Sequence, residues 1–124
     1  MNAVFFVAGA IAMIWSAVKY EVVYRSIVDS FPPQFQDDLT SRYAFPVLVL
    51  GSSTPLPLQD EYVKSLCGSC VFFFCISLGF FFSGNAVFGG FTLFVFSWGV
   101  FHTIKSWKTY RENCDRSDGQ RATE

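Results

Sequence analysis

The chain has 124 residues, of which 52% are apolar, 19% aromatic and only 15% charged. Soluble domains carry about 25% charged residues, and the shortage here lies in long charge-free runs that raise the mean hydropathy to +0.36. This pattern is typical of a membrane protein, and it excludes a disordered tail, a coiled-coil or collagen-like rod and a secreted disulfide miniprotein. The net charge of −1 offers no basic field to a phosphate backbone, so we expect no nucleic acid among the partners.

The first apolar run covers residues 3–18, AVFFVAGAIAMIWSAV. It predicts a transmembrane helix over about 3–20 that continues to about residue 28, ahead of Pro32-Pro33, which stop it. A cleaved signal peptide is the alternative interpretation. Such a peptide has basic residues ahead of its apolar core, whereas here the basic residues follow the run, so we favour an uncleaved helix.

The segment 29–65 is too apolar for a disordered tether, and we expect it to be partly helical. A short helix is predicted to begin at Pro33 and to end at Pro46, because proline suits a first turn and interrupts a helix interior. Phe35, Leu39 and Tyr43 fall at i, i+4 and i+8, which predicts one apolar stripe for interaction.

The stretch after Pro46, PVLVLGSSTPLPLQDEY, is harder to assign. Residues 47–50 suit a short strand without a partner, so we expect an extended segment resting on the membrane surface or on another chain. Thr54 is predicted to cap a helix that begins at Pro55 and leads into the second apolar run.

The second and third apolar runs predict transmembrane helices over 66–83 and 86–105. Their connection, Ser83–Asn85, is so short that the two helices must form an antiparallel hairpin. The polar tail 106–124 has no apolar period, and we expect it to be frayed or disordered. The predicted fold class is an all-α membrane protein: one membrane domain over 1–124, three transmembrane helices, and a partly helical cytoplasmic loop between helix 1 and the hairpin.

All nine basic residues lie in the segments 19–65 and 105–124, and none precedes the first run or lies in the turn. The positive-inside rule therefore predicts a cytoplasmic loop and C-terminus and an outside N-terminus, in a plasma membrane such as the bacterial inner membrane. Tryptophan and tyrosine side chains favour the membrane–water interface. Five of them fall near the predicted cytoplasmic interface, in agreement with this orientation: Trp15, Tyr20, Tyr62, Trp107 and Tyr110.

Candidate chemistry is sparse. Cys67 and Cys70 form a C-x-x-C pair that places two thiols on one helix face, as a metal or redox site requires. No second ligand pair accompanies them, and buried packing is the better interpretation. His102, the single histidine, is best explained as an interfacial side chain. We expect no cofactor, no metal and no enzymatic activity, because no run carries an acidic or basic residue at membrane depth and no nucleophile motif is present.

Helix packing has a clearer signal. Ala8, Ala12 and Ser16 recur every four residues and form a small-residue stripe, which lets helices approach closely in lipid. The leading hypothesis is a non-catalytic interaction or accessory subunit, whose partners are the lipid bilayer and another membrane protein or a second copy. One alternative is a membrane thiol or metal protein. Another is a homo-oligomeric pore or carrier for an uncharged solute, with a lumen lined by Ser69, Ser77, Ser83, Thr92 and Ser97.

Overall fold

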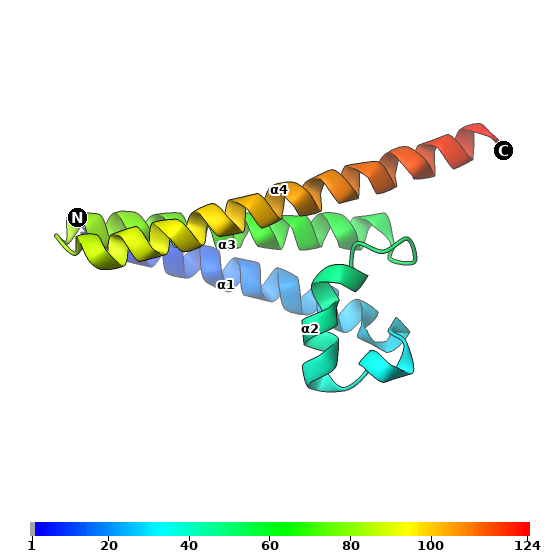
Figure 1. The fold of residues 1–124 in the computed structure, drawn as a ribbon, viewed down its shortest axis with the longest axis horizontal. Coiled ribbons are helices and arrows are strands. Elements are labelled where there is room, and N and C mark those ends of the chain that lie inside the picture. Colours follow the sequence, from blue (N-terminus) through cyan, green and yellow to red (C-terminus); the bar gives the residue numbers. More distant parts are fainter. Residues whose placement is uncertain (1) are drawn as a thin grey trace.

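The computed structural model describes residues 2–124, which form helices and no strand (Figure 1). Three helices are long and apolar enough to cross a membrane, by length and composition: α1 (Asn2–Ile27), α3 (Leu56–Phe82) and α4 (Ala86–Ala122). Between α1 and α3 lie two short 3₁₀ helices, η1 (Val28–Ser30) and η2 (Pro33–Phe35), and the helix α2 (Asp38–Leu48). The all-helical class with three candidate membrane spans is confirmed, and it agrees with an integral membrane protein.

The three long helices lie side by side, with α3 in contact with both of the others. Glycine and serine permit the close approach of α1 and α3. A methyl group on Gly68 would meet the Trp15 ring at 2.8 Å and the Ser16 Cβ at 3.0 Å, so only glycine fits there. The Ser16 hydroxyl donates to the carbonyl of Ser65 at 2.5 Å. Small residues and interhelical hydrogen bonds are what hold helices together in lipid, where burial from water supplies no attraction.

One end of the molecule holds both the N-terminus and the connection between α3 and α4; we call it the turn end (Figure 1). Gly84 adopts φ +77°, a left-handed conformation that glycine enters without steric cost. The Asn85 side chain then caps α4 by accepting from the Phe88 N–H at 3.5 Å. The Asn2 amide donates to the Phe82 carbonyl at 3.2 Å, which ties the start of α1 to this turn.

The apolar core lies toward the opposite end, where α2 runs across the direction of the long helices (Figure 1). Phe45 of α2 is 0% exposed. Its ring packs edge-to-face on Tyr20, Tyr24 and Tyr62, with centroid distances of 4.7, 5.5 and 5.3 Å. The buried members of this core are Val23, Tyr24, Ile27, Phe31, Phe45, Val49 and Tyr62.

The expectation of a frayed tail is wrong, because α4 continues as one helix to Ala122. The apolar part of α4 already forms a helix, so its continuation needs no new nucleation and each further residue only propagates it. A tertiary contact adds to this: the Asn113 amide donates to the Leu50 carbonyl at 3.0 Å and to Gln59 Oε1 at 2.8 Å.

The predicted boundaries of the connecting segment are also corrected. The α-helix begins at Asp38 rather than at Pro33, and Asp37 caps it by accepting from the Thr40 N–H. Pro46 lies inside α2 instead of ending it, so the expected strand or extended segment over 47–50 begins as helix. Because Pro46 has no N–H, the Arg42 carbonyl lacks its partner within the helix. Arg42 and Pro46 are both exposed, so water can donate to this carbonyl instead.

The predicted N-cap of α3 is displaced by one residue. Pro55 occupies the cap position and Leu56 is the first helical residue. Thr54 does not cap the helix; its hydroxyl donates to the Leu48 carbonyl at 3.2 Å and so closes the turn between α2 and α3.

Candidate functional site

The stripe Ala8, Ala12 and Ser16 is divided between the protein interior and its surface. Ser16 is buried against α3, where its hydroxyl also lies 2.7 Å from Ser69 Oγ. Ala8 is exposed. It opens onto a groove of about 450 Å³, here called the α1–α3 groove, whose lining residues are Ala8, Ile11, Ala12, Trp15, Cys67, Gly68 and Val71. Two predicted interaction residues and one predicted thiol therefore share one apolar surface.

The residue that packs on α3 near Ala8 is its neighbour Gly9. An added Cβ on Gly9 would lie 3.3 Å from the Cys75 Cβ, so the two helices are in contact there. Gly9, Ser16 and Val23 are all buried and recur every seven residues. A seven-residue repeat is typical of helices that pack against each other with a left-handed twist. The repeat of Gly9, Ser16 and Val23 therefore predicts the face of α1 that contacts α3, whereas the four-residue spacing of Ala8, Ala12 and Ser16 does not.

The three residues of the second predicted stripe do not share one face. Phe35 ends η2 and is half-buried against the apolar core. Leu39 and Tyr43 are 83% and 90% exposed, and they are joined by Val47 at 78%. The buried face of α2 carries Ser41 and Phe45, so the exposed apolar side chains lie on the opposite face.

Every basic residue of the segment 19–65 has an acidic partner. Lys19 pairs with Glu61, Lys64 with Asp60 and Glu61, and Arg25 and Arg42 both pair with Glu21. The carboxylate of Glu21 raises the pKa of Arg42 by hydrogen bonding to the charged guanidinium. The positive charges of this segment are therefore all held in local ion pairs.

The basic residues of α4 differ in this respect. Within residues 2–124, no ion pair involves Lys105, Lys108, Arg111, Arg116 or Arg121. Arg111 instead packs over the Trp107 ring at 5.0 Å. Among residues 2–124, the five basic side chains of α4 are therefore not held in ion pairs, in contrast to those of the segment 19–65.

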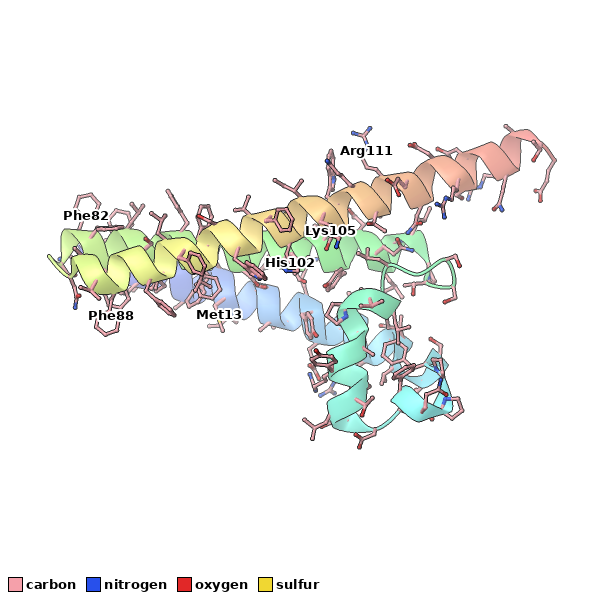
Figure 2. All side chains as sticks on the ribbon, viewed as in Figure 1. Met13, Phe82, Phe88, His102, Lys105 and Arg111 are labelled. Carbon is pink, nitrogen blue, oxygen red and sulfur yellow. The ribbon has the colours of Figure 1, made fainter. Side chains whose placement is uncertain are left out.

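A second groove, of about 560 Å³, lies between α2, α3 and α4, and we call it the α2–α4 groove. Its lining residues are Pro46, Val47, Leu50, Tyr62, Leu66, His102, Lys105, Ser106 and Thr109. Figure 2 shows His102 and Lys105 on α4 at the level of α2, whereas Arg111 points away from α2. His102, which is predicted to lie at the membrane interface, therefore lines a groove that has one apolar and one polar wall.

The candidate thiols have separate surroundings. Cys67 is exposed in the α1–α3 groove, while Cys70 faces α4, with its Sγ 3.3 Å from Thr103 Oγ1. Across residues 2–124, no three metal-ligating side chains of His, Cys, Asp or Glu gather at one point.

The hydroxyls predicted to line a lumen lie in different places. Ser69 lies between α1 and α3, and Ser77 donates to the Gly89 carbonyl between α3 and α4. Ser97 is exposed and bonded to its own helix. Comparison with known proteins adds no further assignment: no protein-family model, curated protein or solved structure matches the chain.

Proposed function

We propose that the protein is a non-catalytic interaction or accessory subunit of a larger membrane complex, and that it binds a transmembrane helix of its partner in the α1–α3 groove. The observation that carries this proposal is the groove itself. It lies along the middle of two apolar helices, and no charged residue lines it. Its Ala8, Ala12 and Gly68 are small enough to let another helix approach closely.

The chemistry of the groove suits a helix better than a solute. Helices associate in lipid through close packing of small residues against larger ones, because the surrounding acyl chains are as apolar as the side chains. Ile11, Trp15 and Val71 are the larger side chains of the lining. The two alanines leave room for a ridge of the partner helix. The groove offers a bound solute almost no polar group, which an uncharged substrate would need for specificity.

The proposed orientation places the N-terminus outside and the basic ends of α1, α3 and α4 in the cytoplasm, in a plasma membrane of the bacterial inner type. The distribution of lysine and arginine supports it, since α4 carries five basic residues beyond its apolar part.

The test is purification of the full chain in mild detergent at its native expression level, followed by native mass analysis. We expect a stoichiometric membrane protein to accompany the wild-type chain. Ala8→Phe, which fills the groove, should abolish this association. Ala17→Phe is the matched control, because Ala17 is exposed on α1 outside the groove lining and should tolerate the ring without loss of the partner.

Each other result rejects the proposal. A pure homo-oligomer that persists in Ala8→Phe would favour the pore or carrier, which flux assays in liposomes would then examine. A monomer whose cellular phenotype disappears on changing Cys67 and Cys70 to serine would favour a thiol protein. Equal loss of the partner in both phenylalanine variants would show that the groove is not the binding surface.

A further inference from the structure

Measured from the turn end, the proposed membrane-spanning parts of α1, α3 and α4 end at the same distance along each helix. At about 1.5 Å per residue, the rise from Asn2 to Tyr20, from Phe82 to Tyr62 and from Ala86 to Ser106 is about 27–30 Å in each helix. This distance matches the hydrocarbon thickness of a bilayer, about 30 Å. With the turn end at one surface, the headgroup region of the other leaflet therefore begins beside Tyr20, Tyr62 and Ser106.

Helix α2 lies at this level and crosses the direction of the span (Figure 1). Its Phe45 packs against Tyr20 and Tyr62, which fixes its depth. The 3₁₀ helices η1 and η2 lie on the side of α2 away from the turn end (Figure 1). The core-facing side of α2 carries Ser41 and Phe45, and the exposed apolar residues Leu39, Tyr43 and Val47 lie on its opposite face. Val47 of this exposed face lines the α2–α4 groove together with Tyr62 and Ser106, which places the groove at the depth of the lipid headgroups.

The two walls of this groove differ in chemistry. Pro46 and Val47 of α2 and Leu66 of α3 supply an apolar wall. The α4 wall is polar, because His102, Lys105, Ser106 and Thr109 follow one another at helical spacing on a single face. An amphiphile placed at this depth would find apolar contacts on one side and hydrogen-bond donors on the other.

The charge in the groove is of one sign. Its lining includes Lys105 and no aspartate or glutamate. Among residues 2–124 Lys105 makes no ion pair, in contrast to Lys19 and Lys64 on the neighbouring helices, which are both paired with Glu61. The side chain is therefore free to bind an anion from outside the chain, and the anion available at this depth is a lipid phosphate.

We propose that the α2–α4 groove binds one phospholipid with an anionic headgroup. Lys105 supplies the charge that attracts the phosphate, and the His102 ring and the Ser106 hydroxyl supply hydrogen-bond donors. Val47 and Leu66 contact the glycerol region and the first part of an acyl chain. This site is separate from the α1–α3 groove and does not depend on the proposed function.

The test places the full chain in nanodiscs made of equal parts phosphatidylcholine and phosphatidylglycerol. Native mass analysis after gentle release then counts the retained lipids. We expect one phosphatidylglycerol per wild-type chain. Lys105→Gln should reduce its retention at least about fivefold, the factor that corresponds to one lysine charge near a membrane surface. Lys108→Gln removes the same charge one turn further along α4, outside the groove lining, and should leave retention unchanged.

A third variant examines the shape of the site without altering charge. Val47→Trp places a large side chain over the groove, and we expect it to displace the lipid while far-UV circular dichroism remains unchanged. Equal loss in Lys105→Gln and Lys108→Gln would indicate attraction to the surface in general and overturn the proposal. Retention of phosphatidylcholine as readily as phosphatidylglycerol would overturn it too, as would full lipid retention by Val47→Trp.

Discussion

The substitution Gly68→Ala perturbs the closest approach of α1 and α3. The new methyl group would lie 2.8 Å from the Trp15 ring and 3.0 Å from the Ser16 Cβ. The ring can turn aside, but the Ser16 Cβ is fixed to the backbone of α1, so the helices must separate. Insertion of a methyl group into a packed contact costs about 1–3 kcal/mol.

Gly90→Ala is the matched comparison, because nothing lies within 4 Å of the methyl group it would add. Both variants gain the same helix propensity, about 0.5–1 kcal/mol, and this gain cancels when the two are compared. The remaining difference is the packing cost alone, which corresponds to about a 5- to 150-fold change in the unfolding equilibrium constant. We expect Gly90→Ala to be more stable than the wild type and Gly68→Ala to be less stable than Gly90→Ala by this amount.

The assay is reversible unfolding in mixed micelles with a rising fraction of sodium dodecyl sulfate. Tryptophan fluorescence is a suitable signal, since Trp15 itself lies against Gly68. Equal stabilisation of both variants would refute the packing of α1 on α3 described above, because it would mean that no side chain opposes a methyl group at position 68.

Three further predictions concern other contacts. Ser16→Ala removes the hydrogen bonds that the Ser16 hydroxyl makes with Ser65 and Ser69 of α3, and it should lower stability by about 0.5–1.5 kcal/mol. Ser97→Ala, whose hydroxyl bonds only its own helix, should leave stability unchanged in the same unfolding assay. Phe45→Ala empties the centre of the aromatic core at a cost of about 3–5 kcal/mol; amide hydrogen exchange should then accelerate throughout α2 but not in the middle of α3, and unchanged exchange in α2 would contradict this role. Asn85→Cys, in a chain whose native cysteines are serine, should react with a membrane-impermeant maleimide on intact cells; labelling only after permeabilisation would reverse the proposed orientation.

Hydropathy alone predicts the three long helices, because a charge-free run of membrane length has no other stable backbone conformation in lipid. Their lengths were harder to predict. The part of α4 beyond residue 105 has no apolar period, and it is helical because it extends an existing helix and because Asn113 contacts the distant Gln59. Local sequence carries no information on a contact of this kind.

The segment between α1 and α3 shows a different limit of prediction from sequence. Pro46 predicts a helix end, yet α2 continues through it because the buried side chains on either side, Phe45 and Val49, fix the helix in the core. The spacing of Phe35, Leu39 and Tyr43 predicts one apolar stripe, whereas only Leu39 and Tyr43 share the exposed face of α2 and Phe35 packs against the core. Periodicity alone does not say whether an apolar face meets the core or remains exposed. The burial of Ser41 and Phe45 is what identifies the core-facing side of α2.

The most direct test of the interaction-subunit account is site-specific photo-crosslinking in the native membrane, with a benzophenone amino acid in place of Ala8 and, separately, of Ala17. The account predicts that the Ala8 position forms an adduct with one other membrane polypeptide and that the Ala17 position does not. Adducts with lipid alone, adducts with a second copy of the same chain, or the same adduct from both positions would contradict it.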